Sequence, residues 1–282
     1  MRIFVLAMLL VSACGTAAGS TALAPPSPPT AALAAWKSFP ANANPRPIIS
    51  FGETTDHIQA SGFPTGDRKI AWLCNKFVLA SDVKLSTIVP GNAFVAGNRY
   101  PSIGSETAYS ELMAARAGGG NPTDCAKAQP FVITAARWAT AGFPTDRGTM
   151  QMTAWLFDIP EVNAYIGHSA VATAAYWGGG VATGGGHGGR ISADGMTLTI
   201  GVVGGPDTPG PCGEDFAGSV AESDTAVAVA ISSRTHGGEG VVCTLEGHFR
   251  TVVLHLAKPM GGRVLLDEKG NPGTVCPETG DC

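Results

Sequence analysis

The sequence predicts a mainly β fold of the β-rich α+β class, with one short helix and two antiparallel β lobes stabilised by disulfides. Short apolar runs recur along the chain and are separated by clusters of Gly, Pro and Asn, a pattern typical of strands joined by turns. Gly and Pro number 38 and 20 among the 282 residues, and only 14% of the residues are charged, which leaves few charges for solvated helix faces.

The first residues predict a secretion signal. Arg2 precedes an apolar stretch at residues 3–11, which is too short to cross the roughly 30 Å hydrocarbon core of a membrane. The run Val11-Ser12-Ala13-Cys14 follows, and it resembles the lipobox of bacterial lipoproteins. The resemblance implies a signal peptide at residues 1–13, cleavage before Cys14, and a diacylglycerol on the Cys14 sulfur. A cut a few residues later, which would release a soluble protein, stays open.

Residues 14–46 are expected to form a Pro/Ala-rich stalk. The segment consists largely of Ala, Pro, Ser and Thr and includes Pro25-Pro26-Ser27-Pro28-Pro29. This composition favours extended polyproline conformations over packing. We therefore expect the segment to hold the folded part away from the membrane surface.

Residues 47–180 are expected to form a β-rich lobe with one helix. The helix is expected at residues 105–116, because Ser105 can cap it, Glu106 adds a favourable charge, and residues 108–116 lack Gly, Pro and β-branched side chains. The predicted strands are short apolar runs bounded by turn residues. They lie at residues 48–51, 69–73, 77–79, 131–134 and 150–157.

Glycine-rich segments at residues 178–189 predict a domain boundary or a long loop. Beyond them, residues 190–282 are expected to form a C-terminal antiparallel β lobe, as a small sheet or a sandwich. Its strand runs alternate with period two or are continuously apolar. They lie at residues 196–200, 225–231, 251–256 and 263–267.

Six cysteines remain once Cys14 is assigned to the lipid. Six cysteines allow fifteen connectivities, and proximity in the sequence favours one of them. Disulfides persist outside the cytoplasm, so this count favours the outer face of the cytoplasmic membrane as the location. The favoured pairs are Cys74 with Cys125, Cys212 with Cys243, and Cys276 with Cys282.

No metal and no cofactor are expected. The sequence has no Cys-x-x-Cys motif, and only Cys243 has a histidine, His248, at the spacing that zinc sites favour. No phosphate-binding loop or dinucleotide fingerprint occurs in its required context.

Two passages carry a further resemblance. They are residues 145–157 and the passage from Glu222 through Cys243 to Arg263. Both resemble segments of uncharacterised exported actinobacterial lipoproteins, over roughly residues 60–270. These motifs are structural rather than catalytic, so the resemblance implies a compartment and a construction and brings no functional residues.

One serine invites a catalytic interpretation. The run Gly167-His168-Ser169-Ala170-Val171 is comparable with the Gly-x-Ser-x-Gly nucleophile elbow, but a valine replaces the second glycine that the strained turn requires. A hydrolase could still use Ser169 as nucleophile, with Asp194 as acid and His236 or His255 as base. A solvent-facing serine without a catalytic role is the alternative.

Tryptophans and net charge bear on the partners. Trp72, Trp138 and Trp155 are expected in the core, whereas Trp177 borders a glycine run and is the candidate for a binding cleft. A net charge of −4 gives no cationic field for nucleic acid, which is not expected as a partner.

These observations predict a membrane-anchored extracytoplasmic lipoprotein that acts as a non-catalytic binding or accessory module of the cell envelope. The lipid bilayer would be its partner through Cys14, together with an envelope component or a protein. Two alternatives stay open. One is an envelope hydrolase that uses Ser169, and the other is a structural spacer without a ligand.

Overall fold

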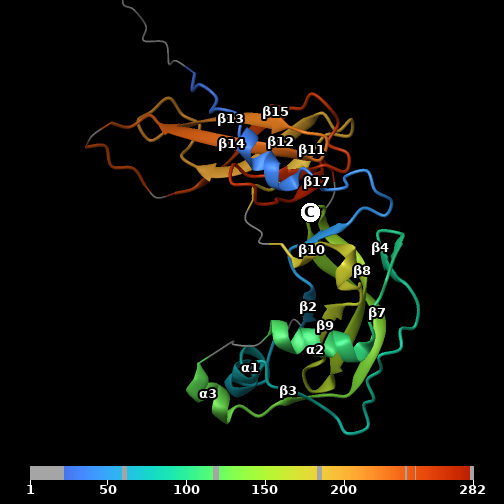
Figure 1. Ribbon diagram of the computed structural model, residues 1–282. Coiled ribbons are helices and arrows are strands. Elements are labelled where there is room, and N and C mark those ends of the chain that lie inside the picture. Colours follow the sequence, from blue (N-terminus) through green and yellow to red (C-terminus); the bar gives the residue numbers. More distant parts are fainter. Residues whose placement is uncertain are drawn as a thin grey trace, which may run out of the picture.

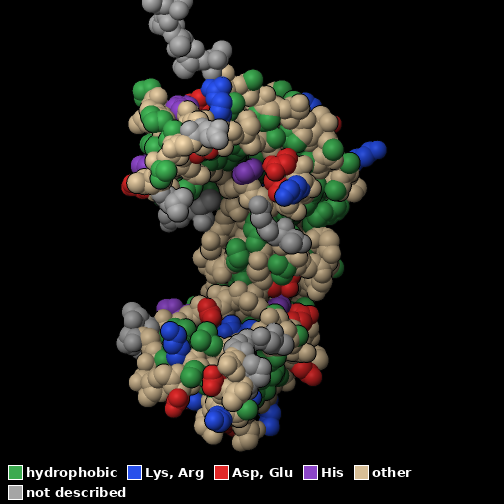
Figure 2. Space-filling view, turned by 90° about the vertical axis from the view of Figure 1, so that its left-hand side faces the viewer, with side chains coloured by type: hydrophobic (Ala, Val, Ile, Leu, Met, Phe, Trp, Pro, Cys, Tyr) green, Lys and Arg blue, Asp and Glu red, His purple; other side chains and the backbone are tan. Residues whose placement is uncertain are grey.

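The computed structural model describes residues 22–58, 62–116, 121–182, 186–238, 240–244 and 246–279. The described part is mainly β, as the sequence predicts, and forms two lobes (Figure 1). Figure 2 shows a narrower waist between them.

An eight-stranded sheet forms the N-terminal lobe. Its main path runs β10-β1-β7-β8-β4-β5, and β9 joins β8 and carries β2 on its other side. The long antiparallel hairpin of β7 and β8 pairs eleven residues on each strand, from Ala135 opposite Asp158 to Thr145 opposite Gly148. The strands are β1 (Ile48–Ser50), β2 (Thr54–His57), β4 (Ala93–Val95), β5 (Asn98–Tyr100), β7 (Ala135–Thr145), β8 (Gly148–Ile159), β9 (Ala164–Ser169) and β10 (Tyr176–Val181).

Helices and a small second sheet cover one side of this lobe. The small sheet pairs β3 (Phe77–Leu79) in parallel with β6 (Phe131–Ile133). Buried aromatic and aliphatic side chains from these elements form one core with β8 and β9. The helices are α1 (Gly66–Leu73), α2 (Ser105–Ala115) and α3 (Pro122–Lys127), and short 3₁₀ turns lie at η2 (Pro160–Val162) and η3 (Thr173–Ala175).

The expectation of a single helix is wrong, because α1 and α3 accompany the predicted α2. Residues 69–73, predicted as a strand, belong to α1. The Thr65 hydroxyl accepts a hydrogen bond from the Arg68 N–H, and Asp67 adds a negative charge to the first turn, so the local signals start a helix. Ala71 and Trp72 are buried on its inner face.

Two facing sheets form the C-terminal lobe, in the orders β15-β12-β11-β17 and β13-β14-β16. An aliphatic core lies between them. Most neighbours are antiparallel, as predicted, but β11–β17 and β14–β16 are parallel. The strands are β11 (Gly189–Ile191), β12 (Thr197–Gly204), β13 (Glu214–Glu222), β14 (Ala226–Thr235), β15 (His248–His255), β16 (Val264–Leu266) and β17 (Val275–Pro277).

The expectation of an extended stalk fails for the second half of residues 14–46. The 3₁₀ helix η1 (Thr30–Trp36) and the residues after it pack on the C-terminal lobe, where Trp36 and Phe39 are buried against β14 and β16. The Trp36 indole N–H donates to the Gly270 carbonyl at 2.9 Å. The small residues dominate the composition of this segment, but these two aromatic rings decide where it lies.

Candidate functional site

Cys14, the predicted lipid-attachment residue, lies outside the described residues, and its role stays a prediction. None of the described helices is long and apolar enough to cross a membrane.

Two predicted disulfides are confirmed, Cys74–Cys125 and Cys212–Cys243. Cys276 is also disulfide-bonded, and its predicted partner Cys282 lies outside the described residues. Disulfides of this kind indicate an oxidising, extracytoplasmic environment.

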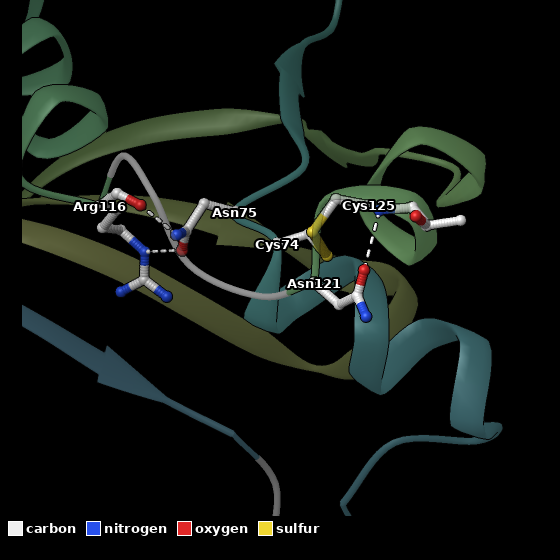
Figure 3. Close-up of a disulfide and its surroundings, with 6 residues drawn as sticks. Cys74, Asn75, Arg116, Asn121 and Cys125 are labelled. Atoms are coloured by element: carbon white, nitrogen blue, oxygen red, sulfur yellow. Dashed lines mark hydrogen bonds between the residues drawn. A yellow bond between two sulfur atoms is a disulfide. The ribbon is translucent and has the colours of Figure 1, made fainter.

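The Cys74–Cys125 disulfide has a structural setting (Figure 3). It joins the end of α1 to α3, and Asn121 caps α3 by accepting from the Thr123 N–H. Beside it, Arg116 Nε donates to Asn75 Oδ1 at 3.0 Å, which ties the end of α2 to the turn after α1. The disulfide therefore joins α1 to α3, and the Arg116–Asn75 hydrogen bond adds the end of α2 to the same group of helices.

Ser169 is placed at the end of β9 and is completely buried. Its hydroxyl shares a hydrogen bond with the Tyr176 hydroxyl at 2.7 Å and accepts one from the Val171 N–H. Burial raises the pKa of Tyr176 well above its ordinary value, so this partner stays protonated and cannot act as a base near neutral pH. The described contacts of the Ser169 hydroxyl include no histidine.

The proposed triad partners of Ser169 lie in the other lobe. Asp194 precedes β12, His236 follows β14, and His255 ends β15. Asp194 accepts hydrogen bonds from the Ser192 hydroxyl and the Met196 N–H within its own turn, and His236 lies 3.0 Å from Asp215. The structure therefore does not bring these residues together with Ser169.

A polar cluster that the sequence reasoning missed lies next to Ser169. His168 is nearly fully buried, and its Nδ1 donates to the Ser169 carbonyl at 2.7 Å. Its Nε2 lies 3.7 Å from Glu111 Oε2 and 3.9 Å from Glu53 Oε2. The three side chains come from β9, α2 and the turn before β2, so no local spacing could have pointed to them.

The pKa values of this cluster are perturbed in opposite directions. Burial lowers the pKa of His168, although the Ser169 carbonyl and Glu111 oppose this shift. Burial, and then the charge of Glu111, raise the pKa of Glu53, one of whose buried oxygens has no hydrogen-bond partner. The cluster therefore combines a histidine whose neutral form is favoured with a carboxyl group whose protonated form is favoured. The described residues contain no group of three or more His, Cys, Asp or Glu arranged to hold a metal ion.

Trp177 lies where the sequence predicts a cleft. It stacks on Trp36 with ring centroids 6.4 Å apart and lines a groove of about 580 Å³. Residues 270–272, the glycine run 178–180 and the small apolar side chains of Ala35, Val181 and Ala182 complete its lining. None of the residues that line it carries a charged side chain.

Glycine is required in the wall of this groove. β10 pairs with β1 at Tyr176 and Val181, and the register shifts between these two positions. Gly178 and Gly179 have φ angles of +78° and +77°, a backbone region that favours glycine. A Cβ atom built on any of Gly178, Gly179 or Gly180 would meet nothing within 4 Å, so this stretch of backbone borders open space.

Comparison with protein-family models, with curated proteins and with solved structures finds no match for the chain. Any functional proposal for this chain therefore depends on its own residues and their geometry.

Proposed function

We propose that this protein is a lipid-anchored binding protein of the cell envelope, whose ligand site is the groove at Trp177. The uncharged groove, with stacked tryptophans on one side and glycine backbone on another, is the observation that carries the proposal. Binding sites of this size usually combine an apolar surface with a few well-placed polar groups.

The chemistry of the groove favours a neutral, ring-shaped ligand with hydroxyl groups. The partly exposed Trp177 ring offers flat apolar contact, and the absence of charged lining residues disfavours an ionic ligand. The irregular pairing of β10 leaves peptide groups of residues 178–180 outside the β1 ladder, where they can donate to and accept from hydroxyls. A sugar ring of a neutral envelope glycan meets these requirements.

The lipid anchor rests on the Val11-Ser12-Ala13-Cys14 run and on the extracytoplasmic environment that the disulfides indicate. Two or more acyl chains hold a protein stably at a bilayer, whereas one does not. Full-length protein should therefore partition into the detergent phase, and Cys14→Ala should move it to the aqueous phase. Wild-type protein that stays in the aqueous phase contradicts the anchor.

Tryptophan fluorescence tests the groove directly, because Trp36 and Trp177 both lie in it. The probe is a panel of neutral hexose hexasaccharides of differing linkage, titrated into the mature protein. We expect at least one member to change the emission saturably, and we expect Trp177→Ala to weaken its binding by at least about tenfold, a loss typical of a central aromatic contact.

Two variants sharpen the assignment. Gly180→Val should also block binding, because its side chain would occupy open groove space without a clash. Trp138→Ala, in the N-terminal lobe beside Trp155, is the matched control and should leave binding unchanged. If no hexasaccharide binds, or if Trp177→Ala binds as well as wild type, the groove is not a glycan site and a spacer without a ligand becomes the better description.

A further inference from the structure

A second pocket lies at the junction of the lobes, apart from the groove at Trp177. It has a volume of about 470 Å³, and its walls include Ile191, Val275 and Pro277 from β11 and β17. Arg147, in the turn between β7 and β8, contributes its side chain from the N-terminal lobe. The Val275 N–H donates to the Asp146 carbonyl at 2.9 Å, so the two lobes meet at this point.

The guanidinium groups of Arg147 and Arg46 both approach the carboxylate of Asp146. Asp146 is almost completely buried, and both of its oxygens accept hydrogen bonds from Arg46, at 3.2 and 2.5 Å. Arg147 reaches the same carboxylate only at 3.5 Å. Two positive charges thus face one negative charge inside the junction.

Other groups nearby do not supply the missing negative charge. Arg147 Nη2 donates to the Arg263 carbonyl at 2.7 Å, which is a neutral acceptor. Glu222 lies 2.7 Å from the Arg263 guanidinium and is paired there. Glu278 also lines the pocket, but it is exposed, and the described contacts include no ion pair between it and Arg147.

The pKa of Arg147 is consistent with an excess of positive charge at this point. Burial lowers the pKa of Arg147 to about 10, the charge of Asp146 opposes the shift, and the charge of Arg46 adds to it. The guanidinium is still fully protonated at neutral pH, so the pocket holds a desolvated cation that is incompletely compensated.

We propose that this pocket binds a monoanionic ligand with an apolar body, whose carboxylate pairs with Arg147 while its alkyl chain lies between Ile191, Val275 and Pro277. An arginine fork matches the geometry of a carboxylate, and the volume suits a ligand of small-molecule size. The site is independent of the proposed glycan groove, since it uses different residues and a ligand of different charge.

Titration calorimetry of the mature protein with decanoate tests the proposal, and decanol provides the same chain without the charge. We expect saturable binding of one decanoate per chain, and binding of decanol at least about tenfold weaker, as expected for loss of a charge-assisted hydrogen bond. Equal affinity for the two compounds, or no binding of decanoate, overturns the proposal.

Three variants locate the binding site. Arg147→Gln removes the cation and should weaken decanoate at least about tenfold while changing decanol little. Ala193→Phe places an exposed aromatic ring at the mouth of the pocket and should weaken both compounds. Arg137→Gln removes an exposed arginine of β7 that does not line the pocket, and it should change neither.

Thermal unfolding distinguishes a lost site from a lost fold. Arg147 also bridges the lobes, so Arg147→Gln can lower the stability of the fold as well as remove the binding site. Ala193 is exposed, so Ala193→Phe should unfold at the same temperature as wild type, and the two variants are compared for this reason. If Ala193→Phe unfolds like wild type and still binds decanoate with wild-type affinity, decanoate binds elsewhere and the proposal is wrong.

Discussion

The core of the N-terminal lobe packs aromatic rings of Trp and Phe among its helices and strands, whereas that of the C-terminal lobe packs Val, Leu and Ile between two sheets. The buried polar groups differ as well. In the N-terminal lobe they include His168 and Ser169 of β9, while in the C-terminal lobe the buried polar side chains among the described residues are Arg263 and Asp267.

Both of these C-terminal residues border the docked N-terminal segment or the junction. The Arg263 carbonyl accepts from Arg147, and the Asp267 turn leads to Gly270, whose carbonyl accepts from Trp36. The core between the two sheets of the C-terminal lobe is thus mainly aliphatic. The comparison teaches that, among the described residues, buried polar side chains are concentrated in the N-terminal lobe and at the junction.

The largest expected effect concerns the segment that joins the two regions. Phe39 is almost fully buried, so Phe39→Ala should lower the free energy of unfolding by about 3–5 kcal/mol through lost burial and a cavity. Urea unfolding measures the change. Ser27→Ala, at an exposed position earlier in the same segment, should change it by less than about 0.5 kcal/mol. Equal effects of the two variants would restore the stalk interpretation for residue 39.

The next effect compares one disulfide from each lobe. The bonds close loops of 51 and 31 residues, so chain entropy alone predicts losses of about 4 kcal/mol each, within about 0.5 kcal/mol of one another. Cys74→Ser with Cys125→Ser should cost more than Cys212→Ser with Cys243→Ser, because Cys74 directly follows α1, which contributes Trp72 to the core.

Urea unfolding followed by near-ultraviolet circular dichroism distinguishes the two disulfide variants. Trp72, Trp138 and Trp155 all belong to the N-terminal lobe, so the first pair of substitutions should alter their signal and the second should not. A larger loss of stability from the second pair would mean that the loops of the C-terminal lobe depend on their disulfide more than the aromatic core does.

The smallest effect concerns Glu53 and depends on pH. Its raised pKa means that the folded state holds the proton more tightly than the unfolded state, so the ionised carboxylate destabilises the fold at neutral pH. This cost disappears as the pH falls through the raised pKa towards the ordinary value of about 4.5. Glu53→Gln imitates the protonated acid and should therefore raise the melting temperature at pH 7 but not near pH 4.

Calorimetry at both pH values tests this prediction, with exposed Glu246→Gln as the control. His168, whose lowered pKa destabilises the fold as the pH falls below about 6.5, contributes to the pH dependence of both proteins. The difference between the two melting temperatures is therefore the quantity to compare. A variant that is less stable than wild type at pH 7 would show that the Glu53 carboxylate forms a favourable interaction there.

Local signals in the sequence predicted much of the β structure. The runs at residues 77–79 and 131–134 became β3 and β6, and proximity in the sequence predicted the bonds Cys74–Cys125 and Cys212–Cys243 correctly. These features depend on neighbouring residues or on small separations. Trp177 also gave a usable signal, because it is adjacent in the sequence to a glycine run and both line the same groove.

Features that depend on contacts between residues far apart in the chain could not be predicted from the sequence. Residues 69–73 have a strand-like composition, but the cap at Thr65 and the packing of Trp72 on Phe131 make them a helix. His168 meets Glu53 and Glu111 only because β9, β2 and α2 converge. The packing of Trp72 on Phe131 and the meeting of His168 with the two glutamates produce no periodicity or spacing in the sequence that could be recognised.

The hydrogen bond from Trp36 to Gly270 spans 234 positions of the chain. During synthesis, Trp36 and Phe39 therefore leave the ribosome long before β14 and β16, the strands that they pack against, are made. Until β14 and β16 emerge, the ring surfaces that these two strands cover stay exposed to solvent or to whatever protein accompanies the growing chain. Fragments that lack the last sixty residues lack β14 and β16 and cannot complete the burial of this segment, so the last part of the chain closes the fold.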